Sequence, residues 1–276
     1  MKVLPFTIPK PNNDALIFQE DKEYVFYNLL HQHAEIQLSY IADGSGTLIV
    51  GDAINSYGPG DILVIDAHLP HVFKSEPAKK QSLMLSLFFT KESFGTHFFS
   101  LGEMQSLENF FRKARQGFKV SQHNLHSQFH QLKYQSSLER FINFLTILEQ
   151  LSNVDSTTLS SFVSKPYTDL EGQRMSAITE YTIRHFNEDI TLKKIASVAN
   201  LSPNAFCKYF KKRTNKSYFS FLNELKIARA CQLLRSSPDL SIVNIAEMAG
   251  FNNLSNFNRQ FKRLKNTTPS LFRSSH

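Results

Sequence analysis

Cysteine is scarce in this sequence: Cys207 and Cys231 are the two cysteines among 276 residues. Both lie in segments with the apolar spacing of helices, so they do not form the disulfide framework that staples small secreted domains. A chain of this length can bury a full hydrophobic core without disulfides or structural metals. We therefore expect a protein of the reducing cytoplasm.

Long apolar runs and leader-like segments are also missing. No stretch approaches the roughly 18 apolar residues that a membrane-spanning helix needs, so we expect no membrane partner. Residues 1–11 are polar and interrupted by proline, which disfavours a signal peptide. Neither a glycine-rich phosphate loop nor a nucleophile elbow frames the Ser, His and Asp residues. We predict no catalytic residues, no cofactor and no enzyme activity.

Negative charge is scarce in the last hundred residues and abundant before them. Residues 173–276 contain 17 Lys and Arg against 6 Asp and Glu, a net charge of +11. Residues 1–172 contain 14 Lys and Arg against 18 Asp and Glu, a net charge of −4. A basic domain suits a polyanion, because neutralising phosphates releases counterions. On charge alone, the C-terminal part either binds nucleic acid or is a solvated basic surface without a partner.

The first third of the chain has the pattern of short β-strands. Apolar runs alternate with the turn sequences at residues 43–46 and 57–60. The expected strands are residues 25–27, 36–41, 47–50, 61–65 and 82–89. Several short strands at this spacing indicate a sandwich or a barrel.

From about residue 106 the apolar residues take the spacing of helices. Helices at about 125–151 would bury an apolar stripe, either against the preceding strands or against a second copy in a homodimer. Residues 152–172, rich in Ser, Thr and Asp and containing Pro166, indicate an interdomain linker. We therefore predict one domain in residues 1–165 and a second in residues 166–276.

The second domain contains an internal repeat. Residues 191–199 match residues 241–249, and each copy begins with an N-cap residue and is followed by Asn200 or Gly250, which tolerate a left-handed turn. In each copy a pair of phenylalanines four residues apart follows, which places one face of the next helix in the core. This is the helix-turn-helix plan. A plain helical protein-interaction domain is the competing interpretation.

The repeat lies within a longer resemblance. Residues 174–273 resemble the DNA-binding domain of the AraC/XylS regulators along their whole length. The stretches that carry the resemblance are residues 195–203, 210–212, 222–227 and 245–251, Phe257, residues 261–262 and 268–269, and Arg273. The resemblance implies seven helices, with recognition helices at about 203–212 and 253–263 in successive major-groove segments. Asn215 and Asn266 replace the usual glycine, Lys226 replaces the usual arginine, and Cys207 occupies a position that often reads bases.

The two recognition helices supply the predicted DNA contacts. Asn and Arg side chains have the geometry to read adenine and guanine edges, respectively. We assign base reading to Arg259 and a phosphate contact to Lys262. The full predicted set is Ser202, Asn204, Cys207, Lys208, Lys211, Asn253, Ser255, Asn256, Asn258, Arg259 and Lys262.

Three histidines mark the first domain. His31 and His33 precede an expected strand, and a Gly-Pro-Gly-Asp turn at residues 58–61 leads to His71. This pattern resembles a cupin barrel of the kind fused to AraC-type DNA-binding domains. In regulators of that type such histidines line or cap an effector pocket, or pack in the barrel. We predict an effector pocket formed by His31, His33, His71 and Tyr40.

A metal site is the alternative use of the same histidines, because two His two residues apart plus a third are plausible ligands. Metal-binding cupins, however, place a carboxylate where this chain has Gln37 and Leu38, and Glu35 comes too early. We therefore predict no bound metal.

These observations predict an α+β protein of two domains: a cupin-like β-barrel with following helices, then an all-α domain with two helix-turn-helix units. The expected function is a sequence-specific DNA-binding transcription regulator, an effector-responsive activator of genes for a carbohydrate or another small metabolite. The expected partners are double-stranded promoter or operator DNA, a small-molecule effector such as a sugar, RNA polymerase and a second copy in a homodimer. The alternative is a metal-dependent cupin enzyme fused to a DNA-binding domain.

Overall fold

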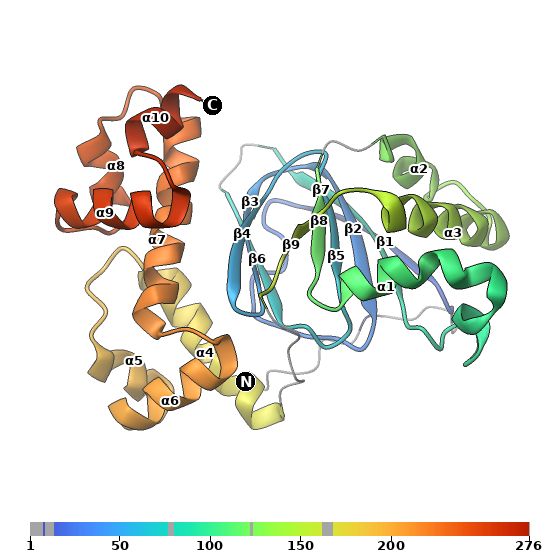
Figure 1. Ribbon diagram of the computed structural model, residues 1–276, viewed down its shortest axis with the longest axis horizontal. Helices are drawn as coiled ribbons and strands as arrows, with labels where there is room; N and C mark the ends of the chain where they lie inside the picture. Colours follow the sequence, from blue (N-terminus) through green and yellow to red (C-terminus); the bar gives the residue numbers. More distant parts are fainter. Residues whose placement is uncertain (1–7, 9–13, 77–79, 122–123, 162–167, 276) are drawn as a thin grey trace. The chain divides into compact units, whose positions relative to one another are not determined.

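A computed structural model describes residues 8, 14–76, 80–121, 124–161 and 168–275. The chain divides into two compact units, Met1–Gly172 and Gln173–His276 (Figure 1). Among the described residues, no helix is both long and apolar enough to cross a membrane.

Unit 1 is built on two antiparallel sheets. The larger has the strand order β1-β7-β2-β5-β8-β9, and the smaller has the order β4-β3-β6. The strands are β1 (Ile17–Glu23), β2 (Ile36–Asp43), β3 (Gly46–Val50), β4 (Ala53–Tyr57), β5 (Ile62–Ile65), β6 (His71–Ser75), β7 (Ser82–Phe89), β8 (Phe118–Val120) and β9 (Thr157–Thr158). The sheets do not close into the expected barrel, because in the described part of the chain neither edge strand of the larger sheet, β1 or β9, pairs with the smaller sheet.

The expected strand at residues 25–27 is wrong, and the edge strand lies earlier. β1 pairs with β7 from Ile17 opposite Phe88 to Glu23 opposite Ser82, which uses all of β7 except Phe89. After Glu23 the chain leaves the sheet, and Phe26 is buried as an anchor for the segment. An edge strand needs few apolar side chains, and β1 contains several charged residues. The alternation of apolar and polar residues that would identify it as a strand is therefore weak in the sequence.

Helices cover one face of the larger sheet: α1 (Glu108–Ala114), α2 (His126–Gln131) and α3 (Ser137–Asn153) (Figure 1). Alternate residues of β2 point to this face, so Leu38 and Tyr40 pack in one apolar cluster with Phe129 and Phe144 of the helices. Because side chains alternate along a strand, the other residues of β2 face the space between the two sheets.

Two short 3₁₀ helices, η2 (Phe98–Ser100) and η3 (Gly102–Leu107), lead into α1.

The first half of the expected linker belongs to unit 1. Ser152 lies in the last turn of α3, and β9 pairs with β8. Leu159 is fully buried in the core cluster between the sheets. Apolar burial of one leucine and the β8 pairing hold a segment whose composition is typical of a linker. Residues 162–167 of that linker lie outside the described residues.

Seven helices are described between residues 169 and 274, the number that the resemblance implies. They are α4 (Asp169–His185), α5 (Leu192–Val198), α6 (Pro203–Thr214), α7 (Tyr218–Ser236), α8 (Ile242–Met248), α9 (Leu254–Lys265) and α10 (Pro269–Ser274) (Figure 1). Each of α5 to α10 begins at a Ser, Thr or Asn side chain that accepts a hydrogen bond from a backbone N–H of the first turn.

The turns after the helices confirm the reasoning from Asn and Gly. Asn200 has φ 52° and Gly250 has φ 86°, both left-handed, at the two helix-turn-helix turns. Asn215 and Asn266, which replace the usual glycine, end α6 and α9 in the same conformation. Asparagine therefore serves where the family pattern has glycine.

Candidate DNA-binding and ligand-binding sites

The first helix-turn-helix unit consists of α5 and α6. Phe206 and Phe210 are almost fully buried, and they orient α6 with one face in the core. The predicted contact residues Asn204, Cys207, Lys208 and Lys211 are all exposed on the rest of α6. Ser202 is the N-cap of α6, so its side chain is engaged with the backbone N–H of Ala205. The predicted face of this helix is therefore accessible.

The second unit, α8 and α9, has the same construction. Phe257 and Phe261 are fully buried, and the predicted residues Ser255, Asn258, Arg259 and Lys262 are exposed. Asn253 caps α9 by accepting a hydrogen bond from the backbone N–H of Asn256 at 3.0 Å.

Asn256 is half-buried and orients its neighbour. Arg259 Nη2 donates a hydrogen bond to Asn256 Oδ1 at 2.9 Å. The amide oxygen thus restrains the guanidinium at the surface of α9. Sequence reasoning assigned Asn256 to DNA, whereas the structure shows that its side chain first positions Arg259.

Two half-buried cations, whose roles were not predicted from the sequence, support the turns. Arg174 Nε donates to the carbonyl of Ala199 at 3.0 Å, and Lys226 Nζ donates to the carbonyl of Gly250 at 2.6 Å. Burial lowers the pKa of Lys226, although nearby Asp189 opposes that shift. Lys226 therefore makes a carbonyl contact in the second unit that matches the one Arg174 makes in the first. The internal repeat was the sequence feature from which two equivalent turn contacts could have been predicted.

A cavity of about 310 Å³ lies in unit 1 between β1 and the smaller sheet. Asp21 and Glu23 contribute carboxylates, and burial raises the pKa of Asp21. Among the described residues that line the cavity there is no Lys or Arg. The full lining is Ile8, Gln19, Asp21, Glu23, Val25, Phe26, Tyr27, His31, His33, Gln37, Phe73, Met84 and Phe88.

The structure brings His31, His33 and His71 together at one end of this cavity. An antiparallel bridge pairs the backbones of His31 and His71, with N–H···O distances of 3.0 and 2.9 Å. One ring nitrogen from each histidine lies within 4.8 Å of the others, and the three side chains are 7%, 3% and 0% exposed, respectively. His31 and His33 line the cavity, and His71 lies behind them in the interior.

Each of these imidazoles has a fixed tautomer. The Nδ1 atoms of His31, His33 and His71 lie 2.8, 2.8 and 2.9 Å from the backbone carbonyls of residues 29, 35 and 69. A carbonyl only accepts, so Nδ1 carries the proton and Nε2 carries a lone pair. Burial lowers the pKa of all three histidines, that of His31 to about 4, so the rings are neutral at pH 7.

Tyr40 is not part of this cluster, contrary to our expectation. It points from β2 toward the helices, where its hydroxyl lies 2.7 Å from His126 Nδ1 and its ring stacks on Phe129. Gln37, on the other face of the same strand, reaches the cluster instead, with Oε1 3.2 Å from His33 Nε2. The parity of the strand decides between them, because successive side chains point to opposite faces.

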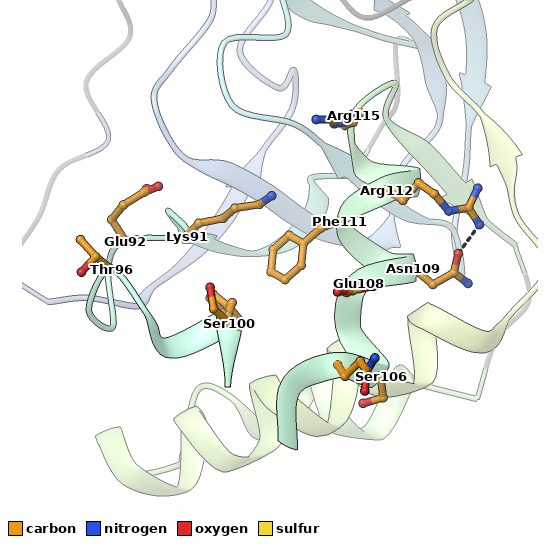
Figure 2. Close-up of a pocket in the computed structure, with 12 residues that line it drawn as sticks. Lys91, Glu92, Thr96, Ser100, Ser106, Glu108, Asn109, Phe111, Arg112 and Arg115 are labelled. Carbon is orange, nitrogen blue, oxygen red and sulfur yellow. Dashed lines mark hydrogen bonds between the residues drawn. The ribbon is translucent and has the colours of Figure 1, made fainter. Parts of the chain in front are cut away.

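A second hollow, of about 830 Å³, lies beside α1 on unit 1 (Figure 2). Phe111 projects into it, with Lys91 Nζ 4.6 Å from the centre of its ring. Arg112 turns to Asn109, to which it donates a hydrogen bond. The hollow is open and carries charges of both signs, including Glu92, so we assign it no role.

Two family models match the chain. Residues 15–90 match the AraC-like ligand binding domain, which includes the histidine cluster and most of the cavity. Residues 195–275 match a helix-turn-helix domain, which includes both recognition helices.

Curated relatives resemble the chain over different lengths. The MmsAB operon regulatory protein of Pseudomonas aeruginosa is 27% identical over 255 residues, which cover 88% of this chain and 76% of that protein. The HTH-type transcriptional activator RhaR of Mannheimia succiniciproducens is 23% identical, over 89% of this chain and 87% of that protein. The uncharacterized regulator YdeC of Bacillus subtilis is 30% identical over 100 residues, and the match spans 34% of its length.

Solved structures resemble the chain more distantly. ToxT from Vibrio cholerae O395 is 14% identical with a TM-score of 0.38, over 94% of this chain and 97% of that one. The DNA-binding domain of AdpA, solved in complex with a target DNA, is 21% identical with a TM-score of 0.36, over 37% of this chain and 92% of that one.

Proposed function

The chain belongs to the AraC family of helix-turn-helix transcription regulators, a family without enzymatic activity, and we propose that it binds specific operator DNA in response to a small effector. The observation that carries this proposal is the pair of exposed recognition faces in a domain of net charge +11. The membership also removes the alternative of a cupin enzyme.

Salt dependence tests the DNA-binding part. When a protein neutralises phosphates, the logarithm of its binding constant falls linearly with the logarithm of the salt concentration, with a slope of about −0.9 per phosphate contacted. We expect the full chain to bind duplex DNA with a steep negative slope in fluorescence anisotropy titrations. A flat response, or no binding at low salt, would exclude this function.

The effector that suits the cavity is a small neutral polyol such as a sugar. A volume of about 310 Å³ is near the lower end of the range for ligand pockets. The carboxylates of Asp21 and Glu23 and the amide oxygen of Gln19 accept hydrogen bonds from hydroxyls, and the carboxylates repel anions. A panel of monosaccharides against the matching sugar acids in thermal-shift experiments tests this, and a preference for the acids would contradict it.

A path from the cavity to the linker is present in the core. Phe26, Phe73 and Met84 line the cavity and share an apolar cluster with Leu159. Two residues after Leu159, the backbone N–H of Ser161 donates a hydrogen bond to the Asp52 carboxylate at 2.9 Å, which ties this end of the segment to unit 1.

An effector that repacks those side chains would therefore shift Leu159 and Ser161, the last part of unit 1 that the structure describes before the linker. This is allosteric control only if the effector binds the two arrangements differently. Leu159→Ala should retain DNA binding and lose the effector response, whereas an unchanged response would exclude this path.

The surface of α3 supports a homodimer. Leu138 and Ile142, four residues apart, are 68% and 57% exposed, while Phe144 and Leu148 hold the helix to the sheet. Large exposed apolar patches mark interfaces. Replacing Leu138 and Ile142 by glutamate should convert dimer to monomer in sedimentation velocity experiments, and a wild type that is already monomeric would contradict this proposal.

Activation through RNA polymerase, at genes for a carbohydrate or another small metabolite, completes the proposal. The support is similarity alone, since one relative is named a transcriptional activator. A promoter reporter in cells with and without this chain tests the direction. Lower expression in its presence would identify a repressor.

A further inference from the structure

We propose that His31, His33 and His71 bind one divalent first-row transition-metal ion through their Nε2 atoms, at the inner end of the effector cavity. The sequence alone argued against a metal because the carboxylate of metal-binding cupins is missing. The structure adds the geometry of the donor atoms, which no spacing rule supplies.

The first observation is the direction of the donors. The Nδ1 atom of each histidine faces a backbone carbonyl, which makes Nε2 the nitrogen with a lone pair, and one ring nitrogen from each histidine lies within 4.8 Å of the others. Metal-bound histidines are held in this way, because a carbonyl or carboxylate on one nitrogen orients the other toward the ion. Neutral imidazole suits Zn, Cu, Fe and Ni ions.

The second observation is an orphaned atom. His71 Nε2 is buried and has no hydrogen-bond partner among the described residues. Buried polar side-chain atoms are paired in the large majority of cases, so such an acceptor requires an explanation. A cation at the centre of the cluster supplies the missing partner.

The third observation is Gln37. Its amide nitrogen donates to Ser39 Oγ at 2.9 Å, which turns Oε1 toward His33 Nε2 at 3.2 Å. Two lone pairs then face each other, an arrangement that an intervening cation stabilises. In a tetrahedral site with bonds of about 2.0–2.1 Å, neighbouring ligand atoms are about 3.3 Å apart.

Gln37 therefore takes the place of the missing carboxylate as a neutral oxygen ligand. Glu35, which the spacing placed too early, lies on the other side of the ring, with Oε2 4.0 Å from His33 Nδ1. A carboxylate there raises the basicity of a ligating imidazole. Because Gln37, His31 and His33 also line the cavity, an oxygen atom of the effector would add to the ion as a fifth ligand, a role that rests on the proposed function.

Metal binding is tested on the full chain without DNA or effector, so its failure leaves the DNA-binding proposal intact. Chelator-treated protein is titrated with Zn²⁺ by calorimetry and with Co²⁺ by visible absorption. We expect one ion per chain and the absorption bands of a four-coordinate Co²⁺ site. No binding, or several weak ions per chain, would overturn the proposal.

Variants locate the ion. Loss of an outer-shell partner costs about 10–100-fold in metal affinity, so His33→Gln, which removes a ligand, should cost more than about 100-fold. Gln37→Glu adds a charged ligand and should raise affinity, which keeps the test informative if His33→Gln is unstable in thermal melts. His97→Gln, at an exposed histidine of the same unit, is the control. Equal Zn²⁺ affinity in His33→Gln, Gln37→Glu and His97→Gln would show that the histidine cluster is not the site.

Discussion

The two helix-turn-helix units share one backbone plan and differ in the side chains that they expose. Phe206 in α6 corresponds to Phe257 in α9, and both are fully buried. Three positions on the exposed faces differ in kind: Ala205, Cys207 and Lys208 in α6 correspond to Asn256, Asn258 and Arg259 in α9. Ala205 has no side-chain acceptor, whereas Asn256 holds Arg259. From this difference we expect α9 to contribute more to base reading and α6 more to contacts with the DNA backbone.

The largest expected effect tests what the units share. Phe206→Ala and Phe257→Ala should each lower the free energy of unfolding by about 3–5 kcal/mol, because each removes a fully buried ring and leaves a cavity. Urea unfolding of the full chain, followed by far-ultraviolet circular dichroism, measures the change. A cost below about 1 kcal/mol for either variant would mean that its core is not packed as described.

A smaller effect should separate the two turns. Asn200→Ala should cost about 1 kcal/mol, because alanine at φ 52° is strained by its backbone conformation alone. At Gly250, φ is 86°, and an added Cβ would lie 2.6 Å from Asn187 Cα and 2.8 Å from the Phe186 carbonyl oxygen. Gly250→Ala should therefore cost about 1–3 kcal/mol more than Asn200→Ala. Equal losses in unfolding experiments would show that the second turn relaxes without strain.

Base reading is the next difference. Arg259→Ala should reduce discrimination at one base pair by about 1–3 kcal/mol, because a guanidinium makes a bidentate contact with guanine. Lys208→Ala, at the matching position of α6, should change discrimination little. Binding to a set of single-base operator variants measures both. If Arg259→Ala weakens all sites equally, the side chain contacts phosphate and the comparison fails.

The smallest expected effect concerns the positions that the units have in common. Lys211 and Lys262 correspond in α6 and α9, and both are exposed. Lys262→Ala should weaken binding to all sequences alike and reduce the salt slope by about one, as expected for the loss of one phosphate contact. Lys211→Ala should do the same. A sequence-dependent loss in either variant would assign that lysine to base reading.

Unit 2 could be predicted from the sequence far better than unit 1. In each copy of the repeat, the N-cap and the left-handed turn residue lie close together in the sequence, Thr191 with Asn200 and Ser241 with Gly250, so local chemistry marks the helix ends. The edge strand β1, in contrast, is stabilised by pairing with β7, some 65 residues away, and its charged residues conceal it. Long-range pairing leaves little trace in a local pattern.

The candidate sites divide in the same way. The exposed DNA-facing residues follow from the spacing of the buried phenylalanines, but the role of Asn256 in holding Arg259 does not. His31, His33 and His71 were identifiable as a group by analogy alone. The ring orientations depend on three backbone carbonyls that face the Nδ1 atoms and on the backbone bridge between His31 and His71. Tyr40 was assigned to them wrongly because the strand's register was not known.

By itself the sequence determined the helical domain, its repeat and its charge, because capping, helical periodicity and net charge depend on neighbouring residues or on composition. Only the tertiary structure decided that the sheets stay open, that Leu159 is in the core, and that Gln37 rather than Tyr40 faces the histidines. Those outcomes depend on which strands pair and in which register. A shift of one residue would have sent every side chain of β2 to the opposite face.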